Sequence, residues 1–339
     1  MFRVGLVGCG WVSGEHIAAY KKNPDTEVVA LVSLSREDAQ RKAKECGVEA
    51  ACYDDLEAML RKEKPDIVSV TAPPHFHVAL GVLAAKHGAQ LVMEKPIAMN
   101  PQELQTLLAA VKTHQTRSVV SFVLRWNPLF QIIRSLLDDG ACGDLFYGEV
   151  DYYHGIGPWY GQFEWNKSRQ AGGNSLLSAG CHAVDGLLWF MGSQAVEVHA
   201  FATRSTSEIY RPYEYPPTLA TLLKFEDGRV GKVTSCIECN APYIFNIQLF
   251  GSGGTIRNNQ LYSNQLKGQT GFATIPTILP DSGDVTHHPF QGEIDHFVNR
   301  LKEGKNSDVP IEYAARVMEI CYAADESAQT GKSVRLPLT

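Results

Sequence analysis

Three features that would each point to a particular class of protein are missing from the sequence. No apolar run approaches the ~20 residues that a membrane-spanning helix needs, so we expect no membrane association. Basic residues are not in excess, because 31 Lys and Arg stand against 37 Asp and Glu for a net charge of -6. This balance argues against binding to nucleic acid. Residues 1–10 (MFRVGLVGCG) lack a signal-peptide pattern, and we expect a cytoplasmic protein.

Cysteine is present, but not as a disulfide framework. The eight cysteines are scattered over 339 residues, which predicts reduced thiols in a reducing compartment. The close pair Cys236 and Cys239 lies in a predicted strand, where side chains three residues apart point to opposite faces. The histidines also lack a convincing ligand pattern. We therefore expect no metal site.

The length and the order of predicted elements indicate an α/β chain with two domains. Over residues 1–122, short β-rich runs alternate with helical stretches. This alternation predicts a doubly wound parallel sheet of the Rossmann type. Residues 123–339 begin with helices and continue with consecutive strand-like runs. There we predict an α+β domain with a large, mainly antiparallel open sheet, used for substrate binding and oligomerisation.

A glycine-rich turn follows the first predicted strand. Gly8, Gly10 and Ser13 form a G-x-G-x-x-small pattern between that strand and a helix. The first glycine permits a tight turn, the second lets the backbone approach a pyrophosphate, and the small residue lets the helix pack closely. Since the helix N-terminus favours negative charge, we predict a dinucleotide site that includes Trp11 and Val12.

The end of the second predicted strand bears on the choice of dinucleotide. NAD sites usually place an acidic residue there for the ribose hydroxyls, but this chain has Ser33, with Ser35 and Arg36 beyond it. A 2′-phosphate would not be repelled, and Arg36 is able to pair with it. The alternative is that Arg36 only begins a solvated helix. The sequence is compatible with NAD or NADP and favours NADP.

The run 91–100 (LVMEKPIAMN) ends a predicted strand with an acid, a base and a proline. In doubly wound folds, ligands bind at the carboxyl ends of the strands, so we expect Glu94 and Lys95 beside the nicotinamide. Pro96 keeps Lys95 out of helical geometry. We predict that Lys95 is a catalytic residue that hydrogen-bonds a substrate hydroxyl. The alternative is a surface Lys–Glu pair.

Together these motifs resemble one known family. The triplet 94–96, the glycine turn 8–10 and the segment 72–77 (APPHFH) resemble the glucose-fructose oxidoreductase / inositol dehydrogenase / rhizopine catabolism (Gfo/Idh/MocA) family. This resemblance implies an NAD(P)-dependent oxidoreductase that acts on a sugar, a cyclitol or a related polyol. It covers essentially the whole chain and continues in 122–128 (FVLRWNP), 171–185 (AGGNSLLSAGCHAVD), 251–256 (GSGGTI) and 326–337 (ESAQTGKSVRLP).

The resemblance also implies roles for residues of the first domain. It places Glu94 and Lys95 at the family's Glu-Lys-Pro signature, close to nicotinamide and substrate. Ala72 and Pro73 match the family's threonine-proline turn, with alanine in place of threonine, so a hydroxyl contact to the cofactor is lost. His77 matches the histidine of that turn, and it is equally compatible with a buried structural histidine.

In the second domain the resemblance implies the substrate site. His182 stands at the position of the family's histidine acid or base, with a core histidine as the alternative, and Asp185 stands at the second acid. Ser178 replaces the first acid, and serine carries no charge near neutral pH, so a step that needs this carboxylate is in doubt. On a helix these three side chains share one face. We add Arg125 and Trp165 as candidate substrate ligands.

Residues 151–168 contain Tyr152, Tyr153, Trp159, Tyr160, Phe163 and Trp165 within a short span. Such a segment needs a flat, partly apolar partner, either a pyranose face or a partner subunit. With the open sheet, the resemblance implies a homodimer or homotetramer through the C-terminal sheet. Two other functions stay open: a glycoside hydrolase or lyase that retains NAD for a transient oxidation, and a non-catalytic nucleotide-binding protein.

Overall fold

The computed structural model describes residues 1–280 and 288–338, and within them the chain forms two compact units. Each unit has its own sheet and its own buried core. None of the described helices combines the length and the apolar character that crossing a bilayer requires. The first unit is Met1–Val123 with Pro289–Ala315, and the second is the described part of 124–288 with that of 316–339.

The units do not follow one another simply along the chain. The first break lies at Val123, and the chain returns to the first unit with Pro289–Ala315. The sequence prediction gave all residues from 123 onward to the second domain, so this returning segment was not anticipated. The assignment of substrate binding and oligomerisation to the second unit stays a prediction.

A six-stranded parallel sheet forms the centre of the first unit, in the order β3-β2-β1-β4-β5-β6. The strand order reverses between β1 and β4, which is the switch point where doubly wound folds bind ligands. Every residue of β4 is buried, as expected for a sheet covered on both faces. The strands are β1 (Phe2–Val7), β2 (Thr26–Val32), β3 (Ala51–Tyr53), β4 (Ile67–Val70), β5 (Gln90–Met93) and β6 (Ser118–Val120).

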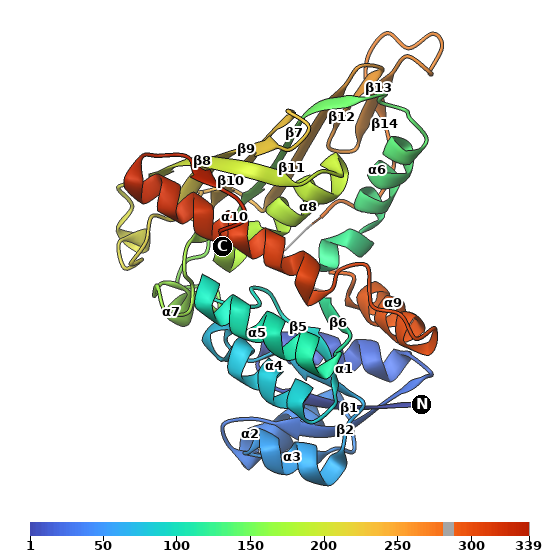
Figure 1. The fold of residues 1–339 in the computed structure, drawn as a ribbon, viewed down its shortest axis with the longest axis vertical. Coiled ribbons are helices and arrows are strands. Elements are labelled where there is room, and N and C mark those ends of the chain that lie inside the picture. Colours follow the sequence, from blue (N-terminus) through green and yellow to red (C-terminus); the bar gives the residue numbers. More distant parts are fainter. Residues whose placement is uncertain (281–287, 339) are drawn as a thin grey trace. The chain divides into compact units, whose positions relative to one another are not determined.

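Helices cover both faces of this sheet (Figure 1). Helix α1 contacts α2 and α9, whereas α4 contacts α3 and α5. Ser35, Asp55 and Asn100 each accept a hydrogen bond from the backbone N–H three residues further on, which fixes where α2, α3 and α5 begin. The helices are α1 (Trp11–Lys22), α2 (Arg36–Cys46), α3 (Leu56–Glu63), the 3-10 turn η1 (Pro74–Phe76), α4 (His77–Lys86), α5 (Pro101–His114) and α9 (Phe290–Lys302).

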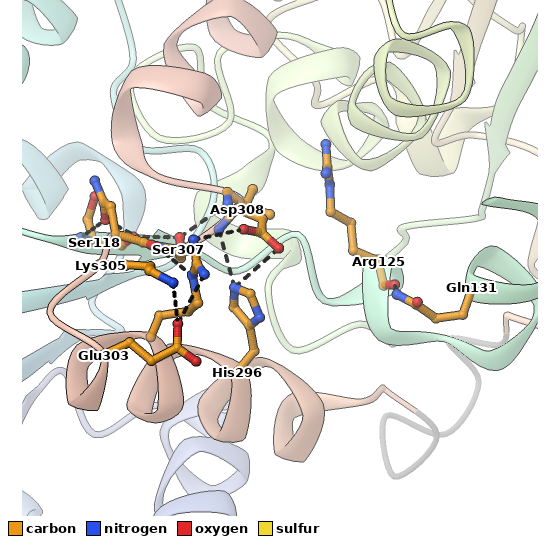
Figure 2. A network of polar contacts seen from close by, with 11 residues as sticks. Ser118, Arg125, Gln131, His296, Glu303, Lys305, Ser307 and Asp308 are labelled. Carbon is orange, nitrogen blue, oxygen red and sulfur yellow. Dashed lines mark hydrogen bonds and ion pairs between the residues drawn. The ribbon is translucent and has the colours of Figure 1, made fainter. Parts of the chain in front are cut away.

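Helix α9 joins the first unit from far along the chain. In the segment after it, Ser307 Oγ donates to Ser118 O at 2.6 Å, and the Val120 N–H donates to Val309 O at 2.9 Å. The Ile311 N–H donates to Ser118 Oγ at 3.0 Å. Figure 2 shows Ser118 and Ser307 within this polar network. These bonds hold the segment along β6 and so fix α9 at this edge of the sheet.

A nine-stranded sheet forms the second unit, in the order β14-β13-β12-β11-β7-β10-β9-β8-β15. Among the described strand pairings within this sheet, only that of β7 with β10 is parallel, so the predicted mainly antiparallel sheet is confirmed. The strands are β7 (Leu145–Tyr153), β8 (Ala195–Thr203), β9 (Thr218–Phe225), β10 (Val230–Cys236), β11 (Ile244–Gly251), β12 (Gly254–Arg257), β13 (Gln260–Ser263), β14 (Ala273–Thr274) and β15 (Val334–Arg335).

One face of this sheet carries helices (Figure 1). Helix α8 contacts β7 and β10, and α6 contacts α8. On the opposite face β9 alternates exposed with buried side chains, which leaves Leu222 half exposed. The remaining elements are η2 (Val123–Trp126), α6 (Pro128–Asp138), α7 (Phe163–Asn166), the π-helical turn η3 (Leu176–Gly180), α8 (Cys181–Met191), η4 (Glu208–Tyr210) and α10 (Ile311–Thr330), which contains the second break between the units.

The helical spacing of residues 175–192 (SLLSAGCHAVDGLLWFMG) predicts a single helix, and the structure differs from this prediction. A π-helical turn, η3, precedes α8 and changes the phase of side chains across the junction. The turn brings Gly180 against β10, where an added Cβ would lie 2.6 Å from Ser235 Oγ. The Ser235 hydroxyl donates to Ser175 O at 2.8 Å. This close approach of backbone to strand explains why the helix is not regular here.

Candidate functional site

Gly8, directly after β1, holds two loops in close contact. Its φ is 99°, and a Cβ at this position would lie 2.4 Å from the backbone nitrogen of Ala72 after β4. Thr71 Oγ1 donates to Gly8 O at 2.7 Å. A side chain is therefore excluded both by the backbone conformation and by the space available.

Gly10 has the opposite surroundings. No protein atom lies within 4 Å of a Cβ built on it. It is the N-cap of α1, and no side chain caps that helix. Ser13 Oγ donates to Gly10 O at 2.6 Å, and the N–H groups of Trp11 and Val12 lie at this end of α1, which no side chain caps. Open space beside uncapped N–H groups fits the pyrophosphate of a dinucleotide.

Arg36 begins α2 and already has an acidic partner. Its Nε lies 3.4 Å from Asp54 Oδ1, and both side chains are more than half exposed. Ser35 caps the helix and donates from Oγ to Asp38 Oδ2 at 2.9 Å. This hydrogen bond and Arg41 lower the pKa of Asp38. A 2′-phosphate near Arg36 would therefore meet acidic side chains as well as the guanidinium.

Glu94, directly after β5, is buried, so the alternative of a surface Lys–Glu pair is wrong. Its Oε1 lies 3.0 Å from Nε2 of His16 on α1, and its N–H donates to Val70 O at 3.0 Å. Burial alone would raise the pKa of Glu94, but His16, Lys95 and His77 together hold it below its usual range. Glu94 is thus an ionised, fixed group immediately before the half-buried Lys95.

His77 connects the end of β4 to the Lys95 turn. Its Nδ1 lies 2.7 Å from Pro96 O and its Nε2 lies 2.7 Å from Ala72 O, and the ring is buried. Burial lowers the pKa of His77, although the two carbonyl contacts act in the other direction. Because a neutral ring has one N–H, only one of the two contacts is a full hydrogen bond. This geometry matches the structural alternative for His77, and Pro73 stays exposed beside it.

The cofactor-binding candidates therefore share one edge of the parallel sheet. They follow β1, β2, β4 and β5, which are neighbours in the sheet and run in the same direction. Their binding to a cofactor stays a prediction. They are Gly8, Gly10, Trp11, Val12, Ser33, Arg36, Ala72, Pro73, His77, Glu94 and Lys95.

In the second unit, two predicted substrate ligands are bound to each other. Arg125 Nε and Nη2 donate to the carboxylate of Asp185 at 2.8–3.1 Å, and both side chains are buried. The guanidinium also lies 4.8 Å from the ring centroid of Trp189. Gln131 donates to the Arg125 carbonyl (Figure 2). A bidentate, buried pair of this kind fixes η2 to α8.

His182 and Ser178 lie on either side of the junction between η3 and α8, and both are buried. Tyr215 is hydrogen-bonded to the Ser178 side chain, and its hydroxyl donates to Asn166 O at 2.7 Å. Burial raises the pKa of Tyr215 well above its usual range. A family-type acid at position 178 would therefore face a neutral phenol.

The aromatic segment 151–168 is partly explained by packing within the second unit. The ring of His154 lies 5.3 Å from that of Tyr160 and 5.6 Å from that of Tyr243. Tyr213 OH donates to Ile156 O at 2.9 Å. Trp165 on α7 is half-buried. The Pro- and Tyr-rich segment 209–218 thus supports the aromatic segment, a contact that the sequence did not predict.

Several side chains of the site were missed from the sequence. His16 on α1, Ser121 after β6 and Glu293 on α9 are buried polar groups around Glu94. The available signal for His16 and Glu293 was a polar residue among the apolar positions of a predicted helix, although their burial is a property of the fold. Within the described ranges, no three His, Cys, Asp or Glu side chains gather as a metal site.

Comparison with known families gives two matches along the chain. Residues 2–122 match an oxidoreductase family with an NAD-binding Rossmann fold. Residues 130–257 match the GFO/IDH/MocA C-terminal domain. The two matches lie in the same order as the parallel sheet and the mixed sheet described above.

Individual relatives resemble the chain over nearly its full length. The D-apiose dehydrogenase of Paraburkholderia graminis is 25% identical, over 99% of this chain and 90% of its own. The D-glucoside 3-dehydrogenase of Escherichia coli is 25% identical, over 98% of this chain and 97% of its own. A levoglucosan dehydrogenase, solved in complex with NADH and levoglucosan, superposes with a TM-score of 0.89 over 99% of both chains. Its identity of 20% means that this likeness concerns the fold.

Proposed function

Because the chain belongs to the Gfo/Idh/MocA oxidoreductase family, we propose that it is an NAD(P)-dependent dehydrogenase or reductase for a CH–OH group of a sugar, cyclitol or related polyol. The observation that best supports this function is the open space at Gly10 beside the uncapped start of α1. It lies on the same sheet edge as Lys95. The relatives named for D-apiose and D-glucosides support a small polyol as substrate.

In the proposed reaction, the chain's own residues handle the hydroxyl proton and the substrate's orientation. When bound, the dinucleotide supplies the two-electron acceptor or donor. Lys95 hydrogen-bonds the reacting oxygen, and His182 takes the hydroxyl proton or returns it in the reverse direction. Arg125 and Asp185 hold α8, the helix that carries His182, because their pairing fixes η2 to α8.

Ser178 and the aromatic segment complete the proposed substrate site. Ser178 is suited to hydrogen-bond a sugar hydroxyl, but it has no carboxylate that could carry a charge. Trp165 offers a half-buried ring for the apolar face of the sugar. The rings of His154, Tyr160 and Tyr243 add aromatic surface in the same unit.

For the cofactor we propose NAD or NADP. Ser33 carries no charge to repel a 2′-phosphate, and the guanidinium of Arg36 would attract one. Asp54 competes for Arg36, so the earlier preference for NADP is reduced by the 3.4 Å contact between them. None of the eight cysteines, all of them in the described ranges, is part of a disulfide, which supports our proposal of a cytoplasmic location.

A fluorescence titration with NADH and NADPH, followed by a turnover screen with polyols, tests this function. Mass spectrometry of the purified protein first establishes whether a nucleotide is already bound. We expect exchangeable binding, and turnover that falls on the order of 100-fold or more in Lys95→Met. Lys86→Met, on the exposed surface of α4, is the matched control. A nucleotide that cannot be exchanged would favour the hydrolase or lyase that retains NAD. If neither NADH nor NADPH binds, the proposed function is wrong.

For assembly we propose a homodimer or homotetramer through the helix-free face of the nine-stranded sheet. Phe201 on β8 is 67% exposed and Leu222 on β9 is 50% exposed, and the strand register places them on the same face. Such apolar exposure favours burial against a second copy. Light scattering should report an oligomer that Leu222→Glu dissociates and that Leu34→Glu, an exposed leucine of the first unit, leaves intact. A wild-type monomer at micromolar concentration would contradict the assembly.

A further inference from the structure

Glu293 on α9 is a buried carboxyl that the proposed reaction does not use. Its side chain is inaccessible to solvent, and Oε1 accepts a hydrogen bond from Ser121 Oγ at 3.0 Å. Oε2 has no hydrogen-bond partner among the described residues. An ionised carboxylate in these surroundings would lose its hydration without compensation, so the neutral acid is the stable form.

Two short paths connect Glu293 to Lys95. The N–H of Ser121 donates to Met93 O at 2.9 Å, two residues before Lys95. Glu94, which precedes Lys95, is the charged neighbour of Glu293. Burial and the charge of Glu94 raise the pKa of Glu293 well above its usual range, while that of Glu94 is lowered. The two carboxyls therefore divide into one neutral and one ionised group.

Two further titratable groups near these two carboxyls, His16 and Tyr20, come from α1. Nε2 of His16 lies 3.0 Å from Glu94 Oε1, and its ring centroid lies 5.1 Å from that of Phe290 on α9. Tyr20 is also fully buried, and its pKa is raised by burial, with a further contribution from Glu293. His16 is thus the side-chain partner of Glu94.

We propose that Glu293 is a positioning residue for Lys95: as a neutral acid behind the Glu94–Lys95 turn, it holds Ser121 and leaves Glu94 as the ionised partner of His16. When Glu293 ionises, a second negative charge stands beside Glu94, and the turn that carries Lys95 loses its fixed position. The link to turnover rests on the proposed function, whereas the link to stability does not.

The melting temperature of Glu293→Gln as a function of pH tests the neutral state without any substrate. Because the folded-state pKa of Glu293 lies above the unfolded value of 4.5, its contribution to stability is complete below that pH and declines as the pH rises toward the folded value. The amide does not titrate. From pH 5 to 9 the melting temperature of the variant should rise relative to wild type by roughly 2 °C or more.

The matched control is Glu312→Gln, which changes an exposed glutamate at the start of α10 and should show no such trend. A constant difference between Glu293→Gln and wild type would overturn the proposal. If that variant does not fold, Glu94→Gln decides: removal of the neighbouring charge lowers the pKa of Glu293, so less stability should be lost at alkaline pH than in wild type. An unchanged loss would also overturn it.

The pH profile of turnover then tests positioning. In wild type, kcat should fall on the alkaline side as Glu293 ionises. In Glu293→Gln this fall should be weaker or displaced to higher pH, with KM within about twofold of wild type. The same alkaline fall in both proteins would overturn the positioning role even with the stability trend present. Absence of turnover in wild type would count against the proposed function, while the stability result would still decide the state of Glu293.

Discussion

The two units hold their candidate site residues in different ways. In the first, the glycine candidates contribute backbone groups at the end of a strand. Gly8 lies against Ala72, and Gly10 has open space beside it. In the second, the candidates are buried side chains, and Arg125 and Asp185 bind each other. A backbone site fails when atoms are added, whereas a buried ion pair fails when one partner is removed. We therefore expect added atoms to be most harmful at the candidate sites of the first unit, and the removal of a side chain to be most harmful in the second.

The largest effect is expected in the second unit. Arg125→Met leaves the Asp185 carboxylate buried without its partner, and the free energy of unfolding should fall by about 3–5 kcal/mol. The double variant Arg125→Met/Asp185→Leu should recover most of this loss, because two apolar side chains need no compensation. Urea unfolding measures both. A double variant as unstable as the single one would show that the pair does not act as a unit.

The same double variant separates structure from substrate binding. If Arg125 and Asp185 also position α8 and with it His182, the double variant should still be stable, but its KM for the polyol should rise by on the order of 10-fold. Unchanged KM would make the pair purely structural.

In the first unit, the effect of an added methyl group should depend on which glycine receives it. Gly8→Ala meets both a positive φ and backbone atoms at 2.4 Å, so we expect a loss of about 3 kcal/mol in the free energy of unfolding. Gly10→Ala meets no atom within 4 Å and should unfold like wild type, yet its methyl group would fill the space that we propose for the pyrophosphate. NADH affinity, measured by fluorescence, should drop on the order of 10- to 100-fold. Unchanged affinity would remove this assignment.

Local patterns explain why the first unit was largely predictable. A strand, a glycine turn and a helix are contiguous in the sequence, so the local pattern is enough to identify Gly8 and Gly10. The strand Ala51–Tyr53 was not predicted, because its three residues are too few to show an alternation of apolar and polar side chains. The return of Pro289–Ala315 to this unit depends on contacts with β6 nearly 200 residues away, which no local pattern encodes.

Partner choice explains why the site was predicted only in part. The motifs marked Arg125 and Asp185 as polar and special, but not that they bind each other across 60 residues of sequence. Ser178 was expected on a regular helix, and the close approach of Gly180 to β10 replaced that helix with a π-helical turn. Burial of Glu293 is equally a property of the fold, because it depends on α9 meeting α1.

A smaller effect is expected at His77, which connects the two loops of the first unit. His77→Gln should lower the free energy of unfolding by about 1–3 kcal/mol, since the flexible amide does not reproduce the contacts of the ring with both buried carbonyls. The folded-state pKa lies below the unfolded value of 6.5, so this stabilisation is present above that pH and is lost as the pH falls toward the folded value. The difference from wild type should shrink between pH 7 and pH 5. His87→Gln, on the surface, should show neither effect, and a difference that grows in acid would contradict the neutral ring.

The smallest effect is expected at Arg36, where both the residue and its partner Asp54 are more than half exposed. Exposed pairs contribute roughly 0–1 kcal/mol, so Arg36→Ala should leave stability almost unchanged. Loss of the guanidinium should weaken NADPH binding about fivefold, equivalent to about 1 kcal/mol, and NADH binding by less than twofold. Asp54→Ala frees Arg36 and should strengthen NADPH binding by a similar factor. Parallel titrations of the two nucleotides decide this. Equal changes for NADH and NADPH would mean that Arg36 only begins a helix, and that the choice of cofactor is made elsewhere in the first unit.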